Sequence, residues 1–261
     1  AQAEAFDATP ANLDARTQRF ALASGLKVAL VPKGARGQAV RAQLHLRLGD
    51  EQSLRGQATV ASMLGSLLDK GGAGMTRQQV ADEFDRLRAK VGFGISGQDL
   101  SVNITTVREQ LPAVIRLVGK LLRDPALPDA VLEENRQQWL AGIEQQRKEP
   151  GAVASNTIAR HGNPYPRGDL RYTASFDEQV QDVASVKPEQ LRAFHRRFLS
   201  AAHGEFRAAG DMDVAAVRAA LDAAIGDWRA PADGAKPFAR VPQPMLNVAP
   251  ERFLLRTPDK Q

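Results

Sequence analysis

The chain has 261 residues, of which 43% are hydrophobic and 25% are charged. This composition is typical of a folded globular protein and excludes disordered and collagen-like chains. Cysteine is absent from the sequence, which excludes disulfide bonds, thiolate nucleophiles and cysteine-ligated metals. The net charge of +5 would suit a nucleic-acid binder, but the basic residues are scattered, and their densest run, at 192–197, has the spacing of a surface helix. We therefore expect no nucleic-acid partner.

The sequence also bears on membrane insertion and on the two ends of the chain. No apolar run approaches the roughly 20 residues that a membrane-spanning helix needs, so we expect no membrane span. The chain shows no signal peptide, begins without methionine and ends directly after a strand-like run. We interpret both ends as cuts from a longer protein.

The first third of the chain alternates between lead-in, strand and helix patterns. Residues 1–16 are small and polar and are interpreted as a lead-in without a regular element. Residues 17–32 alternate apolar and polar side chains on both sides of a Ser-Gly turn, which predicts a hairpin. The run at 39–49 has the same alternation and predicts a strand with one polar side. Its apolar residues are Val40, Ala42, Leu44, Leu46 and Leu48.

Helical spacing begins at Gly56, after which apolar residues recur at three- and four-residue steps as far as the glycine pair at 71–72. Thr76 is predicted to cap a second helix, whose apolar stripe ends at Val91. The glycine-spaced run at 92–107 predicts a pair of strands. Two long helices are expected next, at about 108–122 and 128–148.

The last part of the chain is predicted to close one domain and to begin another. Two or three shorter helices are expected within 151–200, followed by a strand at 204–211 and a helix at 213–228. Residues 231–250 are rich in proline and are interpreted as a linker, and 251–261 as the first strand of a second, truncated unit. The order of elements predicts one α+β domain over residues 17–230.

The four histidines offer no catalytic or metal-binding pattern. His45 is interpreted as a surface residue of its strand, His161 as a turn residue, and His195 as a residue at a helix surface or boundary. His203 is placed at a loop-to-strand junction. No two histidines stand four residues apart, and neither H-E-x-x-H nor H-x-x-E-H occurs.

Other chemical motifs are absent or have structural explanations. The sequence has no G-x-S-x-G turn for a serine nucleophile. The glycines of GFGISG are followed by a strand pattern, whereas a phosphate-binding loop needs a helix to begin there. The acidic pair at 133–134 lies near a helix start, where the helix dipole accounts for it. Taken alone, the residues predict no active site.

Several strings nevertheless occur in a characteristic order. SGLKVALVPK at 24–33 is followed by LRLGDEQSLRG at 46–56, then by GQATVASMLGSLLDKGG at 56–72, and finally by GDMDVAAVRAALDAAIGDW at 210–228. Together these strings resemble the insulinase/pitrilysin-type zinc metallopeptidases, the inverted zincins. The resemblance covers residues 17–230. It implies an antiparallel or mixed sheet with helices packed on one face.

The family carries its zinc motif, H-x-x-E-H, on the helix that the string at 56–72 resembles. The resemblance places Thr59 and Met63 at the two histidine positions and Ser62 at the position of the general-base glutamate. In active members the histidines bind zinc and the glutamate polarises the metal-bound water. Hydroxyl and thioether side chains do neither.

The third zinc ligand of the family is a glutamate on a later helix. The resemblance places its position near Ala141 or Gly142, with Glu144 close by. A single carboxylate does not make a zinc site. We therefore expect no catalytic residue, metal ligand or cofactor in this segment, and zinc in the catalytic half of the parent protein.

The resemblance also implies a function for an inert domain. Peptidases of this family close two similar halves around a peptide, and typically one half alone holds zinc. The leading hypothesis is a zinc-free domain that forms part of the substrate chamber wall opposite the catalytic half, in the same protein or a paired subunit. Its partners would be that half and a peptide substrate, and the segment alone would be inactive.

Two further expectations come from the resemblance. The alternative function is a non-peptidase structural or assembly subunit of the same fold, like the inert relatives that serve as core proteins of respiratory complexes. Long bacterial members of the family are commonly exported, so the expected location is periplasmic or secreted, and otherwise cytoplasmic.

Overall fold

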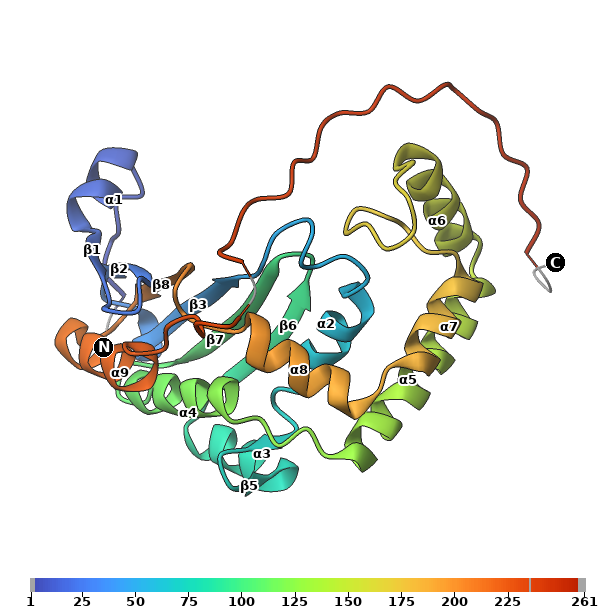
Figure 1. Cartoon of the computed structure of the whole chain (residues 1–261). Helices are drawn as coiled ribbons and strands as arrows, with labels where there is room; N and C mark the ends of the chain where they lie inside the picture. The colour runs from blue at the N-terminus through green and yellow to red at the C-terminus, as the bar shows by residue number, and fades with distance from the viewer. Residues whose placement is uncertain (1–2, 235, 258–261) are drawn as a thin grey trace.

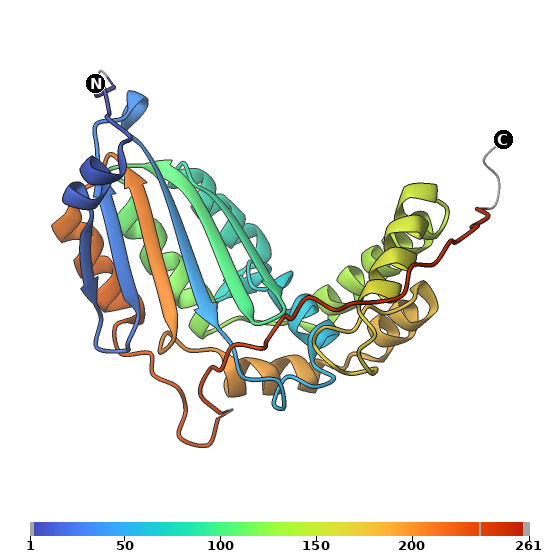
Figure 2. The ribbon, with the colours of Figure 1, turned by 90° about the horizontal axis from the view of Figure 1, so that it is seen from above.

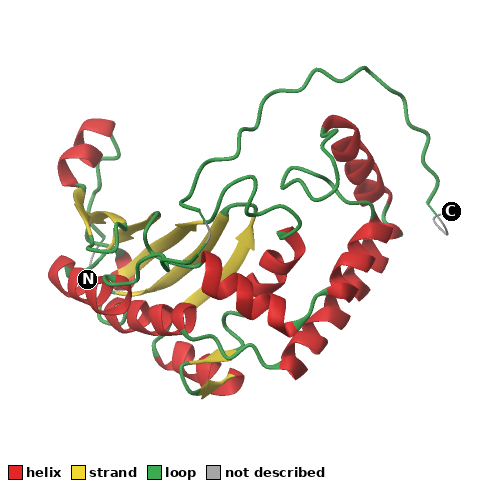
Figure 3. Ribbon diagram, in the orientation of Figure 1, coloured by secondary structure: helices red, strands yellow, loops and turns green. Residues whose placement is uncertain are grey.

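The computed structural model describes residues 3–234 and 236–257 and shows an α+β fold (Figures 1 and 3). A six-stranded sheet in the order β1-β2-β8-β3-β7-β6 forms its centre. β2 and β8 run parallel and all other neighbours are antiparallel, so the predicted mixed sheet is confirmed. The six strands are β1 Gln18–Ala21, β2 Lys27–Pro32, β3 Ala39–Arg47, β6 Lys90–Ser96, β7 Asp99–Val107 and β8 Gly204–Gly210. β4 Gly71–Gly72 and β5 Met75–Thr76 form a separate small pair.

The alternation in β3 shows how the sequence divides the sheet into two faces. Its even-numbered residues from Val40 to Leu46 are buried, and its odd-numbered residues are exposed or half-buried. β7 has the same pattern, with Leu100, Val102 and Ile104 buried. Because side chains alternate across a pleated strand, one face of the sheet joins the core and the other faces solvent.

Helices cover the apolar face. The helices are α1 Pro10–Arg16, α2 Ala58–Gly65, α3 Arg77–Arg86, α4 Leu111–Arg123, α5 Asp129–Arg147, α6 Pro150–Gly162, α7 Phe176–Ser185, α8 Pro188–Phe198 and α9 Val214–Ile225, and the 3₁₀ turn is Arg36–Gln38. Figure 2 shows α3, α4 and α9 together on one side of the sheet, as predicted. α4 and α9 approach closely because Gly119 has no side chain: a Cβ there would lie 2.6 Å from the Cβ of Ala224.

Helices α5, α6 and α7 extend away from the sheet (Figure 1). α5 and α7 pack against each other, and α6 follows α5 at the far end of the molecule from β1 (Figure 1). α2 packs on the edge strand β6, where a Cβ on Gly65 would clash with the backbone nitrogen of Ile95. This glycine therefore allows the helix to approach the strand backbone.

Local sequence signals account for several helix starts. Thr76 caps α3 as predicted, and its side chain accepts a hydrogen bond from the backbone nitrogen of Gln79. Gln79 in turn accepts one from the nitrogen of Thr76, which completes a capping box. Ser175 and Glu178 form the same arrangement at the start of α7.

The structure corrects three predictions about element boundaries, besides the end of α2, which comes at Gly65 and not at the glycine pair 71–72. Residues 10–16 of the lead-in form α1, because Pro10 occupies the first helical turn, where proline is well tolerated. The predicted helix to Val91 ends at Arg86. The chain turns at Arg88, whose φ is +50°, and Val91 then pairs with Ile104 in the sheet.

The third correction concerns the predicted strand at 251–261. Residues 251–257 form no strand, and 258–261 lie outside the described residues. A strand needs a neighbour for its backbone hydrogen bonds, and none of the described strands lies beside this segment. Among the described residues of the linker, 231–234 and 236–250, there is neither helix nor strand.

Candidate functional site

Helix α2 carries the residues at which the sequence predicts a degenerate zinc motif. It begins after Gly56, whose φ is +71° and whose backbone nitrogen donates to the carbonyl of Gly168 at 2.8 Å. The positive φ favours glycine, so this residue lets the chain turn from the loop into the helix. The contact also ties the start of α2 to the loop between α6 and α7.

The three motif residues do not all point to one site. Thr59 and Ser62 are half-buried and line the same hollow, whereas Met63 is fully buried in the hydrophobic core. Metal ligands from one helix must converge on one point. Met63 points into the core instead, where it serves as apolar filling.

The hollow beside these residues, which we call the α2 hollow, has a volume of about 380 Å³ and lies between α2, α5 and α7. Its lining includes Ala58, Thr59, Ser62, Trp139, Gly142, Ile143, Gln146 and Asp182. The structure thus brings the predicted third-ligand position, Gly142, to the same hollow as Thr59 and Ser62.

No carboxylate of α5 lines the α2 hollow. Ala141 is exposed, and Glu144 is paired with Arg147 at 3.5 Å on the exposed side of the helix. Glycine at 142 provides no ligand at all. The hydroxyls of Thr59 and Ser62 are neutral and bind zinc poorly compared with imidazole or carboxylate, so these residues do not fit a zinc ion.

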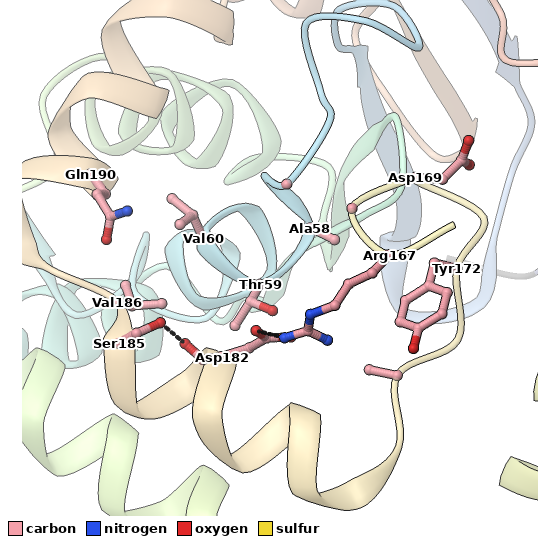
Figure 4. A pocket seen from close by; sticks show the side chains of 13 residues that line it. Ala58, Thr59, Val60, Arg167, Asp169, Tyr172, Asp182, Ser185, Val186 and Gln190 are labelled. Atoms are coloured by element: carbon pink, nitrogen blue, oxygen red, sulfur yellow. Dashed lines mark hydrogen bonds and ion pairs between the residues drawn. The ribbon is translucent and has the colours of Figure 1, made fainter. Parts of the chain in front are cut away.

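A second hollow lies next to the first, between α2 and the loop that connects α6 to α7 (Figure 4). We call it the loop hollow; its volume is about 220 Å³. Arg167 crosses it and donates to Asp182 at 2.7 Å, while its other terminal nitrogen lies 3.3 Å from Glu178. Tyr172 donates to Glu178 at 2.8 Å.

These polar groups are held in structural contacts. Hydrogen bonds from the backbone of Ser175 and from the hydroxyl of Tyr172 lower the pKa of Glu178, and Arg167 adds to this effect. A general acid or base needs a pKa near the working pH, so a carboxylate stabilised as the anion is unsuited to that role. The loop hollow provides hydrogen-bonding groups without an evident catalytic pair.

Two histidine predictions are corrected. His45 is not a simple surface residue: its Nδ1 lies 2.8 Å from Asp99 on the neighbouring strand, and 16% of its side chain is exposed. Asp99 is 54 residues from His45 in the sequence, so no local pattern indicates this contact. His161 is not a turn residue, because α6 continues to Gly162; its Nε2 lies 2.7 Å from the carbonyl oxygen of Ala249.

The other two histidine predictions are confirmed. His195 lies at a helix boundary, with its Nε2 2.7 Å from the carbonyl oxygen of Leu122. Burial lowers the pKa of this imidazole. His203 lies in the turn before β8. Across residues 3–234 and 236–257, no three histidine or acidic side chains come close enough together to hold a metal ion.

No local pattern in the sequence predicts that Arg167, Tyr172 and Asp182 lie beside α2. They follow Thr59 by more than one hundred residues, and only the packing of α7 beside α2 brings them there. The sole local signal was the turn-rich string NPYPRGD, which predicts a loop but not its position.

No protein-family model and no curated protein matches the sequence. Solved structures do match the fold. The inactive domain of a peptidase M16 from Pseudomonas fluorescens is similar with a TM-score of 0.70 and 23% identity, over 85% of this chain and 53% of that one. A protease from Helicobacter pylori gives 0.71 and 14%, over 85% and 52%.

The periplasmic protease PqqL from Escherichia coli is also similar, with a TM-score of 0.70 and 16% identity, over 91% of this chain and 26% of that one. This chain therefore spans about half of the first two proteins and about a quarter of the third. At these identities the likeness establishes the fold, which is that of a unit of the M16, or insulinase-type, peptidases. In the part of the chain that the structure describes, no helix is long and apolar enough to cross a membrane.

Proposed function

We propose that the chain is a zinc-free domain of an insulinase-type zinc metalloendopeptidase. In this proposal it forms part of the substrate chamber wall opposite a catalytic half, and proteolysis belongs to the whole protein. The observation that carries the proposal is helix α2. In a fold shared with M16 peptidase units, it presents Thr59 and Ser62 to the α2 hollow and buries Met63.

The similar structures support the pairing. One is described as an inactive domain, and others are a complete periplasmic protease and its first half. This chain covers 53%, 26% and 49% of these three chains, which leaves room in each for a second unit. By analogy, the partner of this chain is a catalytic half, the substrate is a peptide, and the location is the periplasm.

Zinc content tests the first part of the proposal. The chain is dialysed against zinc, then against metal-free buffer, and its metal content is measured by mass spectrometry. A zinc peptidase of the same fold type serves as the positive control. We expect far less than one zinc per chain and no cleavage of fluorogenic peptides, because the α2 hollow has no imidazole and its one carboxylate, Asp182, is paired with Arg167. Stoichiometric zinc would contradict the proposal.

Complementation tests the second part. A polypeptide with H-x-x-E-H, encoded in the same gene or beside it, is purified and assayed for peptide cleavage with and without this chain. We expect cleavage to require both. If the chain instead joins a stable assembly in which no peptidase activity depends on it, the alternative of a structural subunit replaces the chamber-wall proposal.

A further inference from the structure

The outer face of the six-stranded sheet is the face that α3, α4 and α9 do not cover. Figure 2 looks onto this face, with α3, α4 and α9 behind the sheet. Its central residues Arg41, Gln43, Asn103 and Thr105 are exposed. The hydrophobic core lies wholly on the other side, so the composition of this face is free of packing constraints.

The outer face is strongly positive. Its outward positions hold six cationic side chains, namely Arg19, Lys27, Arg41, Arg47, Lys90 and Arg207. Two carboxylates, Asp99 and Glu205, stand among them. The excess of four positive charges compares with a net charge of +5 for the whole chain. Six of the 35 basic residues of the chain thus lie on this face with only two carboxylates among them.

Several of these cations are unpaired. Arg19 is paired with Asp14, and Arg47 with Asp99. Among the described residues, no carboxylate lies within ion-pair distance of Arg41, Arg207, Lys27 or Lys90.

Arg207 lies opposite Gln43, two residues from Arg41 along β3, which makes the two arginines diagonal neighbours. Unpaired like charges repel, so their grouping costs stability unless an anion is bound.

The shape of the face also suits a polypeptide. A hollow of about 400 Å³ is lined by three cations, Arg19, Lys27 and Arg207, and by one carboxylate, Glu205. At the other edge, Gly92 and Gly94 occupy outward positions of β6, and a Cβ on either would have nothing within 4 Å. Glycine inside a strand often marks a place where another backbone approaches closely.

The dimensions set the length of such a segment. Neighbouring strands are about 4.8 Å apart, so the five spacings from β1 to β6 cover about 24 Å. An extended chain of about seven residues has this length. Polar groups on β7, such as Asn103 and Ser101 beside the two glycines of β6, offer hydrogen bonds to its backbone.

We propose that the outer face binds acidic, extended polypeptide segments, with carboxylates against Arg41 and Arg207 and backbone across the glycines of β6. This inference rests on the chamber-wall proposal and extends it by naming the substrate class, which is acidic peptides. A single-stranded nucleic acid is the weaker occupant. Proteins that bind single-stranded nucleic acids stack the bases on aromatic side chains. The outward positions of these six strands hold no phenylalanine, tyrosine or tryptophan.

The test uses a fluorescent Glu-Gly repeat peptide of about eight residues, a Lys-Gly repeat of equal length and a single-stranded oligonucleotide. Binding to the 261-residue chain is measured by anisotropy at increasing salt. We expect the acidic peptide to bind, the basic peptide not to bind, and affinity to fall with salt. Amide shifts in NMR spectra should localise binding to β3, β7 and β8.

Charge reversal supplies the matched comparison. R41E/R207E should weaken binding of the acidic peptide by about tenfold or more, since each change replaces attraction by repulsion. R116E/R196E reverses two exposed arginines on α4 and α8 and should change it by less than about twofold. Circular dichroism confirms that both variants fold.

Equal losses in the two variants, equal binding of the basic peptide, or no binding of the acidic peptide would overturn the inference. Tighter binding of the oligonucleotide through Arg41 and Arg207 would also overturn it, in favour of nucleic acid. Zinc content and complementation of a catalytic half are measured on the same variants. If those results stand while peptide binding fails, the acidic-peptide assignment alone is wrong.

Discussion

The sheet layer and the α5–α7 arm are stabilised by different forces. In α4, eight of 13 residues are buried, whereas α5 buries three of 19 and α6 buries none of its 13. Apolar burial contributes roughly 25 cal/mol per Å², so the sheet and its helices supply most of the folding free energy. The arm, which consists of helices α5, α6 and α7, buries few side chains of its own. Polar contacts and a partner can therefore determine its position.

Those polar contacts are specific. Arg136 of α5 donates to the carbonyl oxygens of Val183 and Val186 at the end of α7. Arg147 of α5 is paired with Asp177 at the start of α7 at 2.7 Å. Two arginines thus fasten the two ends of α7 to α5.

Phe206→Ala should be the most damaging change. This side chain is 1% exposed in β8, in the middle of the sheet. Its truncation leaves a cavity and should reduce the free energy of unfolding by about 3–5 kcal/mol. Urea denaturation measures the loss. Leu254→Ala, at a side chain that is 89% exposed, is the control and should change little.

Arg136→Met should loosen α7 while sparing the sheet. The arginine side chain is 13% exposed, and its loss leaves two carbonyl oxygens without their charged donor. We expect a cost of about 2–3 kcal/mol, confined to the arm. Hydrogen exchange of residues 176–186 measures it.

The matched control for that change is Arg147→Met, whose arginine is more exposed, at 36%, and pairs with exposed carboxylates. It should cost less than about 1 kcal/mol. Equal acceleration of exchange across the sheet in the Arg136 variant would show that the two layers do not unfold separately.

Asp169→Asn should remove an acid-sensitive link. Hydrogen bonds from the Arg171 side chain and backbone lower the pKa of Asp169 from 3.8 to about 2. Because the folded-state pKa is the lower one, the stabilisation is present above pH 3.8 and is lost as the pH falls toward 2. Allowing for solvent screening, the variant should lose about 1–2 kcal/mol at pH 7.

The pH dependence of unfolding distinguishes this link from a general effect of the substitution. Arg171 also donates to Glu51 and to the carbonyl of Pro242, so Asp169 belongs to a junction of three segments. Between pH 4 and pH 2 the variant should lose less stability than the unmodified chain. Parallel curves for both proteins over this range would rule the link out.

Ile158→Ser should have the smallest effect. Ile158 lies in α6 and is 65% exposed, so little of its apolar surface is buried on folding. The free energy of unfolding should change by less than about 0.5 kcal/mol. A larger loss, in the same urea measurement, would mean that α6 belongs to the cooperative core and would abolish the contrast between the layers.

Helices and strands that a local sequence pattern specifies were predictable. The alternation from Val40 to Leu46 specified a strand with one apolar side, and Thr76 specified the start of α3. The end of α3 was not predictable, since Val91 continues the helical spacing. Pairing of Val91 with Ile104 in the sheet decided its conformation.

The candidate site was predictable in its residue types and not in its geometry. The resemblance identified Thr59, Ser62 and Met63 as replacements at a zinc motif. Burial of Met63 and the approach of Gly142 to the α2 hollow depend on how α2 packs on β6 and α5. Asp182, which lines the same hollow, lies too far along the chain for any local pattern to indicate it.

Local periodicity and residue identity are enough to predict the α+β class, most of the strands and helices, and the lack of imidazole and carboxylate groups at Thr59, Ser62 and Met63. That six cations from five strands share the outer face of one sheet emerges from the folded chain alone. The reason is physical: strand order and register bring distant residues side by side, and these depend on the packing of the whole core.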